Sequence, residues 1–313
     1  MSLEWGDVRH ACATVAIVLT VATRPSAQQA PAFRGSVDLV SLAVTVTDRA
    51  GSPVTGLTAA DFEVREDGRP QVISHFLPGH SDEASAATLH LGVLLDVSGS
   101  MAGEIAFART AAIKFLNALT RAADITVVDF DTEVRVARFG QPDFPRVVER
   151  IRQQKVNGWT ALYDAIGVYL DGAADQDGRT IMLLYSDGGD TRSALGLPGL
   201  IELLKASDVT VYAVGPVAQQ SIAARVPQQM VLRQIAEVTG GQAFFPVGMK
   251  ELDRAYERVL AEIRAEYTIG YLSTNATADG AWRKVDVRLS KPGVRGARLR
   301  SRKGYFALYR PGP

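Results

Sequence analysis

Five oxygen-bearing side chains stand at positions where they could hold a metal ion. The stretch LLDVSGSM carries Asp96, Ser98 and Ser100 directly after a run of aliphatic residues, and YSDGGDT brings Asp187 after a second such run. The third stretch is NGWTALYDAI, where Thr160 stands at the expected start of a helix. Carboxylate and hydroxyl oxygens suit a hard cation such as Mg²⁺, with Mn²⁺ as a substitute.

Each of these stretches also has a simpler explanation. Serine and threonine are favoured N-caps of helices, so the hydroxyl residues could simply begin the helices that follow. The SDGGD sequence could be a tight turn. The two aspartates together argue for more, because a carboxylate buried at a strand end costs several kcal/mol unless a cation or a dense hydrogen-bond network compensates it.

The elements that must position these residues alternate between strands and helices from residue 89 onward. Apolar runs predict strands over 89–96, 124–131, 134–139, 179–187, 208–215 and 242–247. Helical spacing of apolar residues predicts helices over 101–119, 145–154, 161–173, 197–207, 229–241 and 249–267. Such aliphatic strands are buried on both faces, which predicts an α/β, Rossmann-like, mostly parallel sheet with helices on both sides. Ligands of such sheets gather outside the carboxyl ends of the strands, where the five residues stand.

Segments with β character flank this region. Residues 37–47 alternate between apolar and polar side chains, and further strands are expected over 60–68 and 70–76. The C-terminal part returns to strand patterns over 267–273, 282–290 and 297–309. Neither segment has enough strands to be stable alone. We therefore expect the two to pack as one β-sandwich, with the α/β region inserted between them.

The N-terminus and the composition of the chain indicate its cellular location and the class of its partner. Residues 11–23, ACATVAIVLTVAT, form an apolar run too short to span a bilayer and typical of a secretory signal peptide, which predicts a secreted or periplasmic protein. An N-terminal membrane anchor or a buried helix is the alternative. Lys and Arg (34) balance Asp and Glu (34), which disfavours nucleic acid as a partner. Cys12 is the only cysteine, so no disulfide can form within the chain.

The five residues, in this order and context, resemble the metal-ion-dependent adhesion site of the von Willebrand factor type A domain. The pattern is Asp96-x-Ser98-x-Ser100, then Thr160, then Asp187 in Ser-Asp-Gly. The flanking stretches GLTAADFEVREDG and RSRKGYF resemble an exported bacterial subgroup of such proteins. The expected organisation is a signal peptide over 1–30, an N-terminal β module over 31–80, a linker over 81–88, the type A domain over 89–266 and a C-terminal β segment over 267–313.

The resemblance implies a role for each residue. Ser98 and Ser100 would bind the metal directly, and Thr160 directly or through water. Asp96 and Asp187 would act mainly through bound waters and hydrogen bonds behind the ligands. A glutamate or aspartate of a protein partner would complete the coordination, which implies adhesion-type binding and no catalysis.

Two other functions stay open at this point. One is a structural or assembly scaffold with a purely structural metal. The other is a metal-dependent hydrolase, which the sequence disfavours because Glu133 stands where the DFDTE stretch would need Thr or Val for a phosphatase motif. LLDVSGS also lacks both a second aspartate two residues after Asp96 and the glycine that a nucleophilic Ser98 would need two residues before it.

The end of the chain is basic. Residues 291–310 contain no acid, and Arg298, Arg300 and Arg302 alternate along an expected strand. The plain interpretation is one solvated strand face. The alternative is a surface that binds an anionic ligand such as a polysaccharide or a lipid headgroup.

Overall fold

The computed structural model describes residues 39–79, 88–119, 122–215, 222–290 and 296–309. The predicted signal peptide lies outside the described residues, and so does the predicted linker except for Thr88. Among the helices in these ranges, none has the length and apolar character needed to cross a membrane.

Six strands form the central sheet in the order β10-β9-β8-β5-β6-β7. Neighbouring strands are parallel, except that β7 runs antiparallel to β6. The sequence predicted this mostly parallel sheet because its central strands are almost entirely apolar, and every residue of β5, β6 and β9 is buried. The strands are β5 (Leu89–Asp96), β6 (Asp124–Phe130), β7 (Val134–Gly140), β8 (Arg179–Tyr185), β9 (Val209–Val214) and β10 (Gln242–Phe244).

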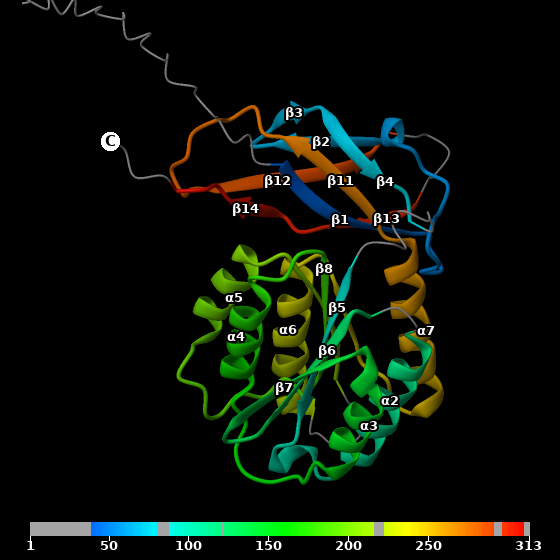
Figure 1. Cartoon of the computed structure of the whole chain (residues 1–313), viewed down its shortest axis with the longest axis vertical. Coiled ribbons are helices and arrows are strands. Elements are labelled where there is room, and N and C mark those ends of the chain that lie inside the picture. Colours follow the sequence, from blue (N-terminus) through cyan, green and yellow to red (C-terminus); the bar gives the residue numbers. More distant parts are fainter. Residues whose placement is uncertain (1–38, 80–87, 120–121, 216–221, 291–295, 310–313) are drawn as a thin grey trace, which may run out of the picture. The chain divides into compact units, whose positions relative to one another are not determined.

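Helices cover both faces of this sheet (Figure 1). One apolar core lies between the sheet and α2 (Ile105–Ala118), α3 (Phe144–Gln153) and α7 (Met249–Ala265). A second core lies between the opposite face and α4 (Leu162–Ala173), α5 (Leu197–Ala206) and α6 (Ile222–Val238). The two cores hold the sheet rigid and leave the loops at its carboxyl edge as the place for function. Short 3₁₀ helices occur at η1 (Ala59–Asp61), η2 (Gly99–Met101) and η3 (Gln141–Asp143).

The two flanking β segments form one sandwich, as predicted. One sheet has the order β13-β1-β11-β4 and the other β14-β12-β2-β3, with a third apolar core between them. The expected strand over 70–76 is split into two strands, and so is the one over 297–309, whose halves enter opposite sheets. The strands are β1 (Leu39–Thr47), β2 (Phe62–Glu66), β3 (Arg69–Gln71), β4 (Ile73–Leu77), β11 (Tyr267–Leu272), β12 (Trp282–Leu289), β13 (Arg298–Arg300) and β14 (Gly304–Phe306).

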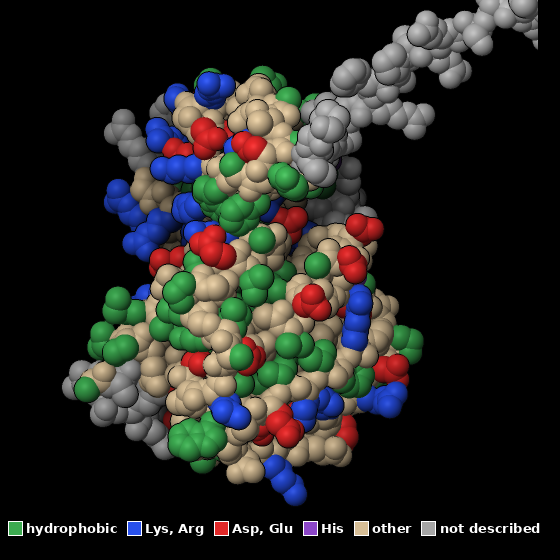
Figure 2. Space-filling view, turned by 90° about the vertical axis from the view of Figure 1, so that its left-hand side faces the viewer, with side chains coloured by type: hydrophobic (Ala, Val, Ile, Leu, Met, Phe, Trp, Pro, Cys, Tyr) green, Lys and Arg blue, Asp and Glu red, His purple; other side chains and the backbone are tan. Residues whose placement is uncertain are grey.

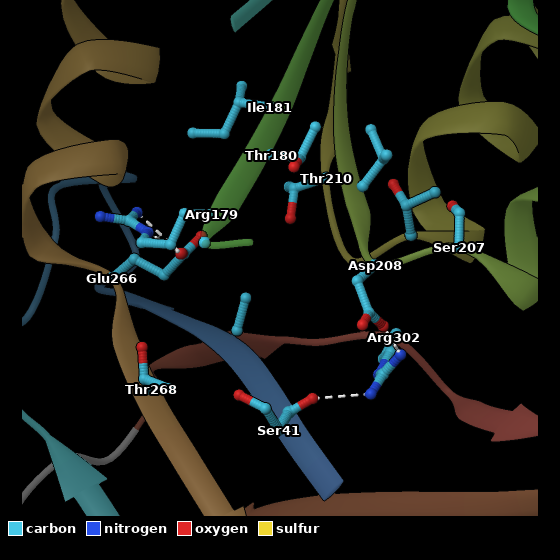
Figure 3. A pocket seen from close by; sticks show the side chains of 14 residues that line it. Ser41, Arg179, Thr180, Ile181, Ser207, Asp208, Thr210, Glu266, Thr268 and Arg302 are labelled. Carbon is cyan, nitrogen blue, oxygen red and sulfur yellow. Dashed lines mark hydrogen bonds and ion pairs between the residues drawn. The ribbon is translucent and has the colours of Figure 1, made fainter. Parts of the chain in front are cut away.

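The basic C-terminal strand is not one solvated face, and that prediction was wrong. Arg300 pairs with the buried Glu262 of α7. Arg302 pairs with Asp208 and donates to the backbone oxygen of Ser41 at 2.7 Å (Figure 3). Only the first arginine of the three, Arg298, is exposed. A buried acid attracts a long cation whose stem can cross apolar surface, and alternation along a strand does not reveal such an acid.

We predict that residues 37–79 do not fold by themselves. The partners of β1 are β11 and β13, β4 pairs with β11, and β2 pairs with β12, and these three partner strands all lie beyond residue 266. Within the fragment only the short β2–β3 pairing remains among the described strands, and an isolated hairpin is marginally stable at best. Circular dichroism and an amide correlation spectrum of this fragment should show an unfolded chain, whereas residues 37–313 should unfold cooperatively. A well-dispersed spectrum of the fragment would disprove the interdependence of the two segments.

Candidate metal centre

The loop from β5 to η2 brings three of the five predicted residues together. Asp96 ends β5 and is completely buried. Its Oδ1 accepts a hydrogen bond from the backbone N–H of Ser98 at 3.0 Å and another from the Ser98 hydroxyl at 2.5 Å. The Ser98 hydroxyl lies 3.2 Å from that of Ser100, which is exposed. The cluster therefore runs from a buried carboxylate to a hydroxyl at the surface.

The loop after β8 brings the second aspartate to the same edge. Ser186, next to Asp187 in the sequence, donates its hydroxyl to Asp96 Oδ2 at 2.7 Å. Asp187 is 5% exposed and accepts the backbone N–H of Gly189 at 2.8 Å. The turn needs glycine at position 188, where φ is +85° and a Cβ would lie 2.6 Å from the backbone oxygen of Gln228.

The third loop carries Thr160 and is bonded to both of the others. Gly99 N–H donates to the oxygen of Gly158 at 3.0 Å, which ties this loop to the first one. The Thr160 backbone oxygen accepts the N–H groups of Thr191 and Arg192, both at 2.9 Å, which ties it to the loop after β8. Thr160 is 5% exposed, and its side-chain hydroxyl makes no hydrogen bond to any residue that the structure describes.

Helix capping does not account for the three hydroxyl residues. The N-cap of α2 is Glu104 and that of α4 is Ala161, so neither position belongs to Ser100 or Thr160. Ser98 is the N-cap residue of η2, but its side chain makes no capping hydrogen bond. The simpler explanation is therefore wrong for these residues, and their oxygens are left for another role.

Burial makes the charged form of the Asp96 carboxyl group unfavourable. Loss of water raises its pKa to about 7, although hydrogen bonds from Ser186 and Ser98 oppose the rise, and the negative charge of Asp187 adds to it. None of the Lys, Arg or His side chains that the structure describes pairs with Asp96. A divalent cation nearby would favour the charged form, because opposite charges lower the pKa of a carboxyl group.

The oxygen donors fit a hard cation held largely by hydroxyl groups. The described residues contain no cluster of three or more His, Cys, Asp or Glu that could hold a metal ion. A site at this edge would thus combine neutral hydroxyls with the two aspartates, and oxygen-only donors favour Mg²⁺ or Mn²⁺ over softer metals.

Two further aspartates, Asp190 and Asp164, shape the loops, although no role was predicted for either. Asp190 accepts hydrogen bonds from the hydroxyl of Ser193 at 2.6 Å and the N–H of Tyr163 at 3.3 Å. The carboxylate of Asp164 accepts the N–H groups of Ala194 and Leu195, both at 2.9 Å. Both aspartates fix the loop after β8 to the start of α4. An aspartate in the first turn of a helix was the available signal for Asp164.

The DFDTE stretch is engaged in ion pairs. The buried Asp129 pairs with Arg135 at 2.7 Å and with Arg150 at 2.5 Å, and Asp131 also pairs with Arg135 at 3.0 Å. These carboxylates hold β6, β7 and α3 together, which accounts for their presence without catalysis.

The model of the von Willebrand factor type A domain family matches residues 90–258. The chain belongs to this family. Solved structures with similar folds include a von Willebrand factor type A protein from Catenulispora acidiphila (14% identity, 86% of this chain and 74% of that chain covered, TM-score 0.49). Another is the corresponding domain of the type V pili tip protein Mfa5 from Porphyromonas gingivalis (12% identity, 56% and 96% covered, TM-score 0.45). No curated protein sequence matches the chain. Type A domains generally mediate protein–protein interaction or adhesion.

We predict that Asp96→Asn stabilises the metal-free type A domain at high pH. Because burial raises the pKa of Asp96 from 3.8 to about 7, the unfolded chain loses this proton at lower pH than the folded chain. The stability that protonated Asp96 contributes is therefore present below about pH 4 and is lost as the pH rises to about 7. Asparagine keeps an acceptor for Ser98 without the charge. In EDTA, urea unfolding should show a gain of up to about 4 kcal/mol at pH 8 and little change near pH 4. An equal difference at both pH values would contradict the assignment.

Proposed function

We propose that the chain is an exported adhesion-type binding protein that captures a glutamate or aspartate of a protein partner through Mg²⁺ or Mn²⁺. Ser98, Ser100 and Thr160 would hold the cation, while Asp96 and Asp187 would act through water and hydrogen bonds. The observation that carries this proposal is that Ser98 and Ser100 adjoin the buried Asp96, that the loop of Thr160 is bonded to the loops of Ser98 and Asp187, and that none of the three hydroxyl side chains has a capping role.

The chemistry of the donors supports capture of an acid. A cation bound there would keep much of its positive charge, because its direct hydroxyl ligands are neutral and the two aspartates would act on it only through water and hydrogen bonds. A partner carboxylate could therefore gain a strong electrostatic contact at the site. The chain's own residues would orient the cation and keep its open side toward the surface, where Ser100 is exposed.

An exposed tryptophan beside the site also supports contact with a partner. Trp159 precedes Thr160 and is 66% exposed. Its backbone N–H donates to the hydroxyl of Thr132 at 2.9 Å, so the loop that carries the indole is held in place. A large aromatic side chain on a rigid loop is a common anchor of protein interfaces.

We predict that Thr160→Ala weakens binding of Mg²⁺ and Mn²⁺ by about tenfold or more without changing the melting temperature of the metal-free chain. The hydroxyl bonds to no described residue, so its loss should cost the fold little. Calorimetric titration of the full chain measures the affinity. Thr110→Ala is the matched control, since Thr110 is exposed on α2 and its hydroxyl bonds the oxygen of Ala106 in the same helix. Equal metal affinity of Thr160→Ala and wild type would remove Thr160 from the site.

A pull-down distinguishes capture of a partner's acidic side chain from a scaffold in which the metal is purely structural. Wild type and Thr160→Ala serve as baits in a pull-down from a periplasmic or extracellular extract, with Mg²⁺ or with EDTA. Loss of the same interactor in EDTA and in the variant is the expected result. An interactor retained under both treatments would favour the scaffold with a structural metal.

A further inference from the structure

A groove of about 810 Å³ begins beside the candidate metal centre. Ala161, the residue after Thr160, is part of its lining, so the groove starts one residue from a proposed ligand. Val134 of β7, Val168 of α4 and Leu195 give it aliphatic walls. Val168 is 46% exposed. Figure 2 shows the molecule from the side on which α4 and α5 cover the sheet. The groove is therefore open to a partner and continuous with the site.

The walls of the groove are fixed before any partner arrives. Residues 190–195 are bonded to the Thr160 loop and to the start of α4 through Asp190 and Asp164, as described above. The Ser193 hydroxyl adds a further bond by accepting the N–H of Asp164 at 3.0 Å. A preformed groove binds with little ordering cost, which is typical of recognition sites.

Gly167 keeps the groove open at a cost to the helix. It lies inside α4, where glycine is less favourable than alanine. A Cβ at this position would meet Leu195 Cδ2 at 3.5 Å and Leu203 Cδ1 at 3.9 Å, both ordinary contacts, and φ is not positive. Packing therefore does not require a glycine here. A larger side chain would fill the groove between Val168 and Leu195.

Arg192 is the charged side chain of the groove that is available to a partner. Asp164 also lines the groove, but its carboxylate already accepts two backbone N–H groups. Arg192 is exposed, and its guanidinium has neither a hydrogen bond nor an ion pair with the residues that the structure describes. An unpaired cation beside a proposed metal site complements a partner that is acidic over several residues.

We infer that this groove selects the partner of the proposed function: an extended acidic segment with an aliphatic side chain two or three residues from the metal-binding acid. An extended chain rises about 3.3 Å per residue, so such a side chain reaches past Ala161 toward Val134, Val168 and Leu195. A second acid of the segment faces Arg192. This inference rests on the proposed capture of an acidic side chain.

The test uses the full chain and a library of nonapeptides with glutamate fixed at the centre and the other positions randomised. Peptides retained in Mg²⁺ and released by EDTA are sequenced. Wild type should enrich Val, Ile or Leu within three residues of the glutamate, together with a further acid. Gly167→Leu should abolish the aliphatic preference and weaken the best peptide by about tenfold or more. Gly172→Leu is the matched control, because Gly172 lies in the same helix and faces open space.

A second pair of variants protects the test against misfolding. Val168→Asp places a charge in the aliphatic wall of the groove and should act like Gly167→Leu. Val72→Asp, at a position 81% exposed in the sandwich, should behave as wild type.

The preference for a second acid is tested at Arg192. Arg192→Gln should lose this preference and Arg192→Lys should keep it, while Arg152→Gln on α3 leaves it unchanged.

The outcomes distinguish the two proposals. In one outcome, peptide binding needs Mg²⁺ and the central glutamate but shows no preference for flanking residues. In another, it keeps that preference in both Gly167→Leu and Val168→Asp. Either result overturns the inference about the groove and leaves the proposed function standing. Absence of any binding that depends on both Mg²⁺ and glutamate overturns the proposed function and the groove with it.

Discussion

The complete burial of the Asp96 carboxylate is the constraint on which the candidate centre depends. A carboxylate removed from water needs hydrogen-bond donors. Asp96 has one in its own loop, Ser98, and another in the loop after the neighbouring strand β8, Ser186. The second donor exists only because β5 and β8 are parallel neighbours with Leu95 opposite Tyr185. The register of the sheet thus sets the position of Asp187, which follows Ser186.

The same burial explains why hydroxyls outnumber acids at this edge. Asp187 already raises the pKa of Asp96, and another nearby carboxylate would raise it further. Neutral hydroxyls can offer oxygen atoms to a cation without adding to this repulsion. The cost is weak binding by any single ligand, so the loops must be fixed in advance. The hydrogen bonds from Gly99 to Gly158 and from Thr191 to Thr160 do this at the backbone.

Much of the fold could be predicted from the sequence, because its central strands are nearly pure aliphatic runs and its helices have regular apolar spacing. The five candidate residues were visible for a related reason: polar side chains at the ends of such runs have to be near one another in a parallel sheet. Whether the five surround one cation stays a prediction.

What could not be predicted depends on contacts between distant parts of the chain. Glu66 is an example: it is 2% exposed at the end of β2 and accepts hydrogen bonds from the hydroxyls of Tyr271, Ser273 and Tyr305. In the sequence it is an ordinary acid before a turn. The pairing of Arg300 with Glu262 was hidden in the same way, since the two charged residues lie in different elements and 38 residues apart in the sequence. Ser186 was overlooked because its partner, Asp96, lies 90 residues away.

The way the α/β region is inserted into the sandwich has a consequence for binding. The chain enters the region at β5 and leaves it after α7. Arg179 at the start of β8 contacts both connections: its guanidinium donates to the carboxylate of Glu266, and its backbone N–H donates to the oxygen of Thr88. Both connections therefore lie at the amino ends of the parallel strands. The candidate centre and its groove lie at the carboxyl ends, a full strand length away. Insertion at the amino ends thus keeps the described connections to the sandwich away from the carboxyl edge, where Trp159 and Arg192 are exposed. A partner can meet that edge without breaking any strand pairing of the sandwich.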